Sequence, residues 1–174
     1  RKAIVFVHPT TCSCTPGHPD MPLPMLEFPF DTTRTIVSLL YAEAFTKYKD
    51  IQFIFCHGGG TIPFLVYRID MMLQAKAAAA GFAAPDVKTA LGGLYYELAT
   101  SVSAPVVQAL LDLVPIERLL LGTDYPFVAP WRIEALMAGF EGLGLSGDEL
   151  EKIEFGNART LFPRFRAEPE RQPR

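Results

Sequence analysis

FIFCHGGG, residues 53–60, is an apolar run that ends in a histidine followed by three glycines. Two other apolar runs of the chain end in a similar way. Residues 3–7 are followed by His8, and residues 119–122 are followed by Thr123 and Asp124. Short apolar runs between turn signals are typical of the buried strands of a parallel sheet. Parallel barrels keep their chemistry at the carboxyl ends of the strands, so these runs predict one site at one edge of the sheet.

The composition is typical of a folded domain. The chain has 174 residues, of which 49% are hydrophobic, and its formal net charge is -3. These values argue against a disordered chain, and the lack of a long basic run argues against a nucleic-acid partner. The apolar stretches are of strand length or are interrupted, so we expect no membrane span. Three sparse cysteines favour reduced thiols and a cytoplasmic location. A chain that opens on Arg1 just before a strand is expected to be a piece of a longer polypeptide.

Helical patterns separate the strand patterns. The prolines predict a long loop over residues 9–29 that could cover a substrate, and apolar positions predict helices from about Asp31, over 64–80 and over 131–140. Further patterns predict a strand at 94–98, a helix capped by Ser103, and a final helix with a capping box at Ser146 and Glu149. Strands separated by helices require a parallel sheet. The sequence thus predicts an α/β fold of four βα units, half of a (β/α)8 barrel, over residues 1–163. We expect residues 164–174 to form a charged flexible tail.

Three residues are candidates for the chemistry of this site. His8 and Asp124 are candidate metal ligands, since imidazole and carboxylate groups suit Zn²⁺. His57 is a candidate general acid or base, because the glycines after it let the backbone turn and leave the imidazole open to a cavity. Each residue also has an ordinary interpretation as a hydrogen-bonded histidine, a histidine buried under its loop, or an aspartate in an Asx turn. Agreement among three strand ends favours the catalytic interpretation.

A second metal hypothesis uses a cluster near the start of the chain. Its members are His8, Cys12, Cys14 and His18. Their spacing matches none of the common zinc spacings, so this hypothesis is the weaker one. Cys56 is expected to point to the opposite face of its strand and to belong to the core. Glu97 either supports the metal ligands or forms a structural salt bridge.

The segments around these residues resemble the second amidohydrolase family, in the branch of aminocarboxymuconate semialdehyde decarboxylase, γ-resorcylate decarboxylase and fungal 6-methylsalicylate decarboxylase. The matching segments are residues 5–9, 55–60 with 63–64 and 68, 95–97, 121–127, and 156–158 with 161–162. The resemblance implies a TIM barrel of the metal-dependent hydrolase type, of which this chain forms the last four βα units. It implies that His8 and Asp124 bind Zn²⁺ or Mn²⁺ and that His57 transfers protons. That family takes two further ligands from a His-x-His motif, which this chain lacks.

The same resemblance implies a non-oxidative decarboxylase of an aromatic or dienoic carboxylic acid. Arg68 is then expected to hold a substrate carboxylate in the site of the neighbouring subunit of a homodimer, although a lone arginine on a helix is usually a surface cation. Tyr125, Phe127 and Trp131 are expected to contact a flat substrate. Two alternatives stay open: a metal-dependent hydrolase of a lactone or amide, with Asp124 as base, and an inactive truncated remnant that serves as an interaction module.

Overall fold

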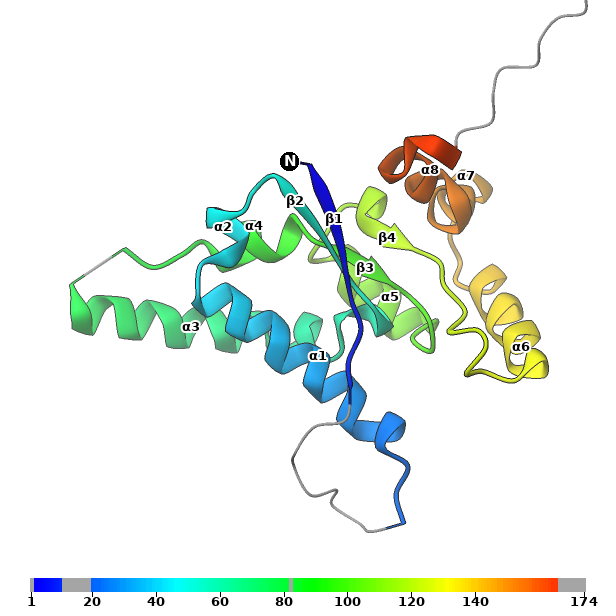
Figure 1. The fold of residues 1–174 in the computed structure, drawn as a ribbon, viewed down its shortest axis with the longest axis horizontal. Helices are drawn as coiled ribbons and strands as arrows, with labels where there is room; N and C mark the ends of the chain where they lie inside the picture. Colours follow the sequence, from blue (N-terminus) through cyan, green and yellow to red (C-terminus); the bar gives the residue numbers. More distant parts are fainter. Residues whose placement is uncertain (1, 11–19, 82, 166–174) are drawn as a thin grey trace, which may run out of the picture.

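A four-stranded parallel sheet forms the centre of the molecule (Figure 1). The computed structural model describes residues 2–10, 20–81 and 83–165. The strands lie in the order β1 (Ala3–Val7), β2 (Ile51–Phe55), β3 (Tyr95–Glu97) and β4 (Leu119–Leu120). Consecutive strands are neighbours, and helices join them. The predicted α/β fold of successive βα units is therefore confirmed.

Helices fill the connections between the strands. The helices before β4 are α1 (Leu23–Tyr41), α2 (Ala44–Lys47), η1 (His57–Gly59), α3 (Ile62–Ala80), α4 (Val87–Gly92), α5 (Ala104–Leu111) and η2 (Ile116–Arg118). After β4 come α6 (Pro130–Glu141), α7 (Gly147–Glu151), the π-helical turn η3 (Lys152–Gly156), α8 (Asn157–Leu161) and η4 (Pro163–Phe165). In Figure 1, α6 to α8 lie beyond β4, on the far side from α3. None of the described helices combines the length and the apolar character that a membrane crossing requires.

The core lies between the sheet and the helices that cover it. Tyr96 of β3 is fully buried there, and its hydroxyl donates a hydrogen bond to the carbonyl oxygen of Leu91 at 3.1 Å. Ile36 of α1, Leu110 of α5 and Leu119 of β4 are equally buried. Because side chains alternate along a strand, the burial of Tyr96 in this core turns the next residue, Glu97, toward the opposite face.

The glycines after His57 allow the chain to turn tightly between β2 and α3. Gly59 and Gly60 have positive φ angles of 72° and 65°. A Cβ atom on Gly59 would lie 2.6 Å from the Tyr96 ring, and one on Gly60 would overlap the carbonyl oxygen of Pro29. The Thr33 hydroxyl donates to that same carbonyl at 2.7 Å and accepts from the Thr61 N–H at 2.9 Å, which fixes α1 against the turn. Only glycine fits this close approach.

The start of α1 differs from the prediction. The helix begins at Leu23 instead of near Asp31, so the expectation of a loop over residues 9–29 is wrong for its last part. Pro24 lies in the first turn, where a missing N–H costs no helical hydrogen bond. Pro29 lies inside the helix, and packing of α1 against the glycine turn compensates for the bond that it removes. Residues 11–19 lie outside the described part of the chain.

The edge strands also differ from the sequence pattern. The apolar run of β1 predicts a buried strand, yet Phe6 is 55% exposed, because β1 has one strand neighbour, β2, in the described sheet. β4 is shorter than the predicted 119–122, because the N–H of Leu121 donates to the carbonyl oxygen of Ile153 in η3 at 2.9 Å. Of the predicted tail, residues 166–174 lie outside the described residues.

Both predicted helix caps lie at the expected positions. Ser146 and Glu149 form the capping box of α7, with side-chain bonds in both directions. Ser103 is the N-cap residue of α5, but its side chain makes no capping hydrogen bond. The α5 helix therefore begins where the sequence predicts, with Pro105 in its first turn, and without the hydroxyl contact.

Candidate active site

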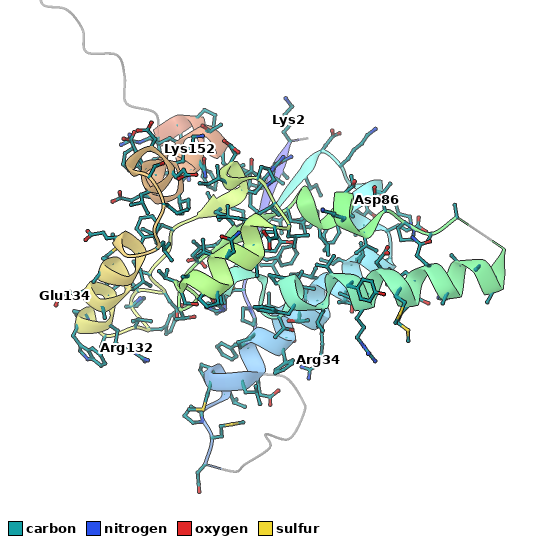
Figure 2. All side chains as sticks on the ribbon, turned by 180° about the vertical axis from the view of Figure 1, so that it is seen from behind. Lys2, Arg34, Asp86, Arg132, Glu134 and Lys152 are labelled. Carbon is teal, nitrogen blue, oxygen red and sulfur yellow. The ribbon has the colours of Figure 1, made fainter. Side chains whose placement is uncertain are left out.

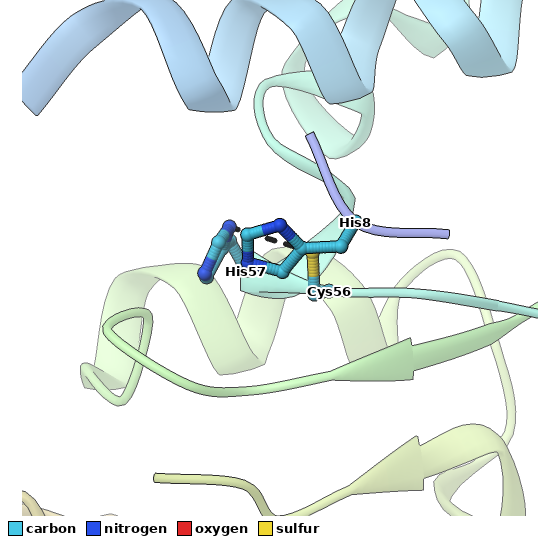
Figure 3. Close-up of side chains that lie close together, drawn as sticks. All are labelled: His8, Cys56 and His57. Atoms are coloured by element: carbon cyan, nitrogen blue, oxygen red, sulfur yellow. Dashed lines mark hydrogen bonds between the residues drawn. The ribbon is translucent and has the colours of Figure 1, made fainter. Parts of the chain in front are cut away.

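His8, His57 and Asp124 line one cavity of about 700 Å³ at the carboxyl ends of the strands. The ring centroids of His8 and His57 lie 5.2 Å apart, and His8 Nε2 lies 3.9 Å from Asp124 Oδ1. Figure 3 shows the two imidazoles beside each other, with Cys56 next to them. The three side chains that the sequence places at separate strand ends therefore lie together in the folded chain.

The tautomer of His8 follows from its hydrogen bond. Its Nδ1 lies 2.7 Å from the carbonyl oxygen of Pro9. A carbonyl oxygen only accepts, so Nδ1 carries the proton and donates it. In the neutral tautomer the lone pair is then on Nε2, which lies 3.9 Å from Asp124 Oδ1. An imidazole held in this way by a backbone carbonyl is the usual form of a metal-binding histidine.

His57 is held in an unusual backbone conformation. Its φ angle is 55°, in the left-handed region, and its N–H donates to the carboxylate of Glu97 at 3.4 Å. Burial lowers the pKa of His57, the nearby Asp124 carboxylate opposes that change, and His8 adds to it. The buried imidazole therefore favours the uncharged form, which can accept a proton.

Glu97 is a buried carboxylate that links the strand ends. It accepts hydrogen bonds from the N–H groups of Ala99 at 2.9 Å and of His57 at 3.4 Å. Burial raises its pKa, although both hydrogen bonds oppose this change. A Cβ atom on Gly122, two residues before Asp124, would overlap the Glu97 carboxylate. Among the described residues Glu97 forms no salt bridge, so of its two predicted roles the geometry favours support of the site.

Cys56 is buried, as predicted, but it lies nearer to the site than the sequence suggests. Its Sγ atom lies 3.5 Å from His57 Nδ1. His8, Cys56 and His57 each offer a possible ligand atom, and these atoms lie within 4.8 Å of one another. Burial, with the charge of Glu97, raises the pKa of the Cys56 thiol to about 12. Among the described residues that line the cavity are His8 and Asp124 but not Cys56, so the pair of His8 and Asp124 is the better candidate.

Four described residues other than glycine have a positive φ angle. Three of them line the cavity, and the fourth, Glu43, precedes α2. His57, Thr100 and Asp124 have φ angles of 55°, 55° and 59°, and all three line the cavity. Threonine is β-branched and rarely adopts a positive φ. Such conformations persist where the surrounding structure imposes them, which is common at functional sites. The strain therefore supports a functional interpretation of this cavity, on an observation independent of residue type.

The other predicted site residues are distributed over two regions. Phe127 lines the cavity, whereas Tyr125 and Trp131, 71% and 66% exposed, do not line it in the described structure. Arg68 lies on α3 and lines a separate cavity of about 430 Å³ between α1 and α3. Of the alternative zinc cluster, Cys12, Cys14 and His18 lie outside the described residues.

Sequence reasoning missed several residues that line the cavity. The Phe28 ring packs edge to face against His8, with 6.1 Å between the ring centroids. It was missed because a loop was expected before Asp31. Thr100 follows β3, and nothing in its sequence context marks it. Arg132 lies in the first turn of α6, where an arginine is ordinarily a surface residue. The described part of the predicted covering loop does line the cavity, as the start of α1.

The fold and the site place the chain in the class of (β/α) barrels with a site at the carboxyl ends of the strands. The amidohydrolase family model matches residues 1–164, and the chain belongs to this family.

The chain is similar to fungal decarboxylases over nearly its whole length. It is 32% identical over 184 residues to decarboxylase macB of Penicillium terrestre, covering 99% of this chain and 53% of that protein. It is 30% identical to decarboxylase yanB of Aspergillus niger, covering 95% of this chain and 47% of that protein. It is 28% identical to the 6-methylsalicylic acid decarboxylase of Penicillium expansum, covering 95% of this chain and 52% of that protein. The chain thus spans about half the length of the curated relatives that it matches.

Solved structures show the same arrangement of elements. An amidohydrolase II crystal structure superposes with a TM-score of 0.83 and 28% identity, covering 92% of this chain and 51% of that one. The dihydroxybenzoic acid decarboxylase of Polaromonas, solved with manganese and the inhibitor 2-nitroresorcinol, superposes with a TM-score of 0.77 and 23% identity, covering 93% and 50%. The second likeness concerns the fold alone. The predicted barrel type is therefore confirmed, with the chain forming four of its βα units.

We expect Gly122→Ala to destabilise the chain by about 2 kcal/mol, because overpacking at a buried site typically costs about 1–3 kcal/mol. The new Cβ would overlap the Glu97 carboxylate, which two N–H groups hold in place. Urea unfolding followed by circular dichroism measures the change. Gly139→Ala is the matched control. Gly139 lies inside α6, its Cβ would lie 3.8 Å from the nearest atoms, those of Val102, and the change should stabilise slightly. Equal unfolding midpoints for the two variants would contradict the packing of Glu97 against Gly122.

Proposed function

We propose that this chain forms part of the catalytic barrel of a metal-dependent non-oxidative decarboxylase that acts on an aromatic carboxylic acid. The single observation that carries the proposal is the meeting of His8, His57 and Asp124 in one cavity at the strand ends. Membership of the amidohydrolase family and the similarity to fungal decarboxylases support the choice of reaction.

The donor atoms fit a divalent cation. Two ligands of a tetrahedral Zn²⁺ ion with bonds of 2.0–2.1 Å lie about 3.3 Å apart. His8 Nε2 and Asp124 Oδ1 lie 3.9 Å apart, so a small side-chain movement would let both hold Zn²⁺ or Mn²⁺. When bound, such an ion supplies positive charge that orients an anionic substrate. The manganese of the Polaromonas enzyme is consistent with this assignment. Catalytic sites usually have three or more protein ligands, so other ligands must complete the set.

His57 is the proposed proton-transfer group. In decarboxylation the bond between the carboxylate and the ring carbon breaks, CO₂ leaves, and the electron pair on that carbon takes up a proton. Because burial keeps His57 uncharged, its imidazole can accept a proton from a substrate hydroxyl and then donate it to the carbon. Its Nδ1 lies beside Cys56, so Nε2 is the nitrogen available for the transfer.

The walls of the cavity suit a flat, apolar ring. Phe28, Met25, Phe127 and Val128 line it together with several prolines. Such walls offer apolar contacts to an aromatic ring, and the few polar groups then fix its orientation. Tyr125 and Trp131, exposed beside Phe127 in the chain, remain proposed substrate contacts for the complete protein.

The reaction is tested with the purified product of the complete reading frame. We expect CO₂ release from hydroxybenzoic acids when Mn²⁺ or Zn²⁺ is added, and loss of it with a chelator. The hydrolase alternative, which would use the same metal ligands, is tested with lactones and amides in ¹⁸O-labelled water, by measuring incorporation of the label into the product. Hydrolysis without CO₂ release would replace the decarboxylase proposal. Failure of the protein to bind either metal would support the alternative of an inactive interaction module.

Single substitutions separate the proposed roles of His57 and Asp124. We expect His57→Ala to keep bound metal and to lose about 10²–10⁴-fold in turnover, the usual contribution of a proton-transfer group. We expect Asp124→Ala to lose metal as well as turnover. Metal content by mass spectrometry and CO₂ release are the two measurements.

Cys56→Ala is the control for the competing donor set of His8, Cys56 and His57. It should retain metal, because the proposed ligands are His8 and Asp124, which line the cavity. Equal metal loss in the His57 and Asp124 variants would make His57 a ligand, and metal loss in the Cys56 variant would assign the ion to the cysteine-containing set.

We also propose that the enzyme is a homodimer in which Arg68 serves the neighbouring subunit. Arg68 lines the cavity between α1 and α3, away from the His57 cavity of its own chain. Apolar side chains on the same helix are exposed: Phe64, Tyr67, Met71 and Met72. An exposed apolar helix face of this kind is suited to contact between subunits.

Mixing experiments test this shared site. Subunits that carry Arg68→Ala and subunits that carry His57→Ala are each expected to be inactive. Random pairing of equal amounts should restore about a quarter of the activity, since half of the dimers are hybrids and each hybrid contains one intact site of two. The measurement is CO₂ release after subunit exchange, monitored with labelled chains. No recovery in chains that demonstrably exchange would leave Arg68 as a surface cation.

A further inference from the structure

Arg132 is the one lysine or arginine among the described residues that line the His57 cavity. It lies in the first turn of α6, which Figure 2 shows at the opposite end of the molecule from α3. We propose that Arg132 is a specificity-determining residue, which binds the carboxylate of the substrate within its own chain. This inference rests on the proposed function. It adds a carboxylate contact from the same chain to the one proposed for Arg68 of the neighbouring subunit.

Backbone hydrogen bonds connect the first turn of α6, which contains Arg132, to the turn that begins at Asp124. The carbonyl oxygen of Asp124 accepts from the N–H groups of Phe127 at 2.9 Å and Val128 at 3.2 Å. The carbonyl oxygen of Ala129 then accepts from the N–H of Arg132 at 2.9 Å. Two consecutive hydrogen-bonded turns therefore fix where α6 begins relative to Asp124. Arg132 is positioned by the same turn that presents the metal ligand, and not by a separate loop.

The guanidinium is available to a ligand. Within the described part of the chain it forms no salt bridge, and the contact recorded for it is with the Trp131 ring, 5.6 Å from the centroid. Most of the other lining residues are apolar, and the remaining charged group is the Asp124 carboxylate. A guanidinium on such a wall offers two parallel N–H donors, which match the two oxygens of a carboxylate. An aromatic acid provides the apolar ring and the anion that this wall can contact together.

The chemistry of the reaction decides which kinetic parameter Arg132 controls. CO₂ carries no charge, so an ion pair with the departing carboxylate weakens as the carbon–carbon bond breaks. The contact therefore stabilises the bound acid at least as much as the transition state. A group of this kind lowers KM and does not raise kcat. This behaviour distinguishes Arg132 from His57, whose contribution lies in turnover.

Trp131 provides a local reporter of binding. It is the single tryptophan of these 174 residues, and the Arg132 guanidinium lies 5.6 Å from the centroid of its ring. Benzoate is the probe, and benzamide, which has the same shape without the charge, is its neutral counterpart. Titration of each probe is followed by tryptophan fluorescence, with calorimetry as a second measure of Kd. Both use the complete protein with its metal.

We expect benzoate to bind at least about ten times more tightly than benzamide, because charge-assisted hydrogen bonds to arginine are stronger than neutral ones. Arg132→Ala should raise Kd for benzoate and KM for the acid about 10- to 100-fold, with kcat within about two-fold. For Arg132→Lys, both Kd and KM should lie between those of the original protein and Arg132→Ala. Lysine keeps the positive charge but lacks the two parallel N–H donors of the guanidinium. Arg34→Ala, on the exposed side of α1 in Figure 2, is the matched control and should change neither value.

The outcomes separate this inference from the proposed reaction. Benzoate binding that depends on Arg132 in a protein without CO₂ release supports the inference and removes the decarboxylase proposal. CO₂ release with unchanged KM and benzoate Kd in both Arg132 variants overturns the inference and leaves the decarboxylase in place. A fall in kcat without a change in KM also overturns it, because Arg132 would then act in turnover.

Discussion

The buried carboxylate of Glu97 is the contact on which the geometry of the site depends. Glu97 is the last residue of β3. Its carboxylate accepts a hydrogen bond from the N–H of His57, which follows β2, and packs against Gly122, which follows β4. Three strand ends are thereby joined at one group. A charge in this position is costly without hydrogen bonds, and the two backbone donors reduce that cost while burial still raises its pKa. The conformation of His57 and the course of the chain toward Asp124 follow from this packing.

The same packing explains why the strain lies around the cavity. His57, Thr100 and Asp124 have left-handed backbones, although none of them is glycine. Each follows a strand whose direction is fixed by parallel pairing with its neighbour, so the chain must turn at a set point. Where a turn also leaves no room for a side chain, the residue with the positive φ angle is glycine, as at Gly59 against Tyr96. At the three other positions the side chain is retained despite the strain, which is consistent with a use for it.

The strands, and the meeting of His8, His57 and Asp124 at one edge of the sheet, could be predicted from sequence, because apolar runs with polar ends indicate both burial and strand direction. The start of α1 could not, because its prolines indicate a loop and only the contact of Thr33 with Pro29 and Thr61 shows why the helix persists. Phe28 was missed for the same reason. β4 is short because Leu121 pairs with the π-helical turn at Ile153, a contact between residues far apart in sequence. Arg132 was missed because only the turns after Asp124 bring it to the cavity.

The open edges of the sheet lie at the rim that carries the two proposed metal ligands, His8 and Asp124. β1 and β4 each have one strand neighbour in the described sheet. Phe6 of β1 is 55% exposed at one of these two edges. In a closed barrel both edges are paired, and the added strands end at the same rim as His8 and Asp124. Any further metal ligands on those strands would enter the cavity beside this pair. Under the proposed function, closure of the sheet would bring such ligands to His8 and Asp124, and the affinity for the proposed ion would depend on pairing at β1 and β4.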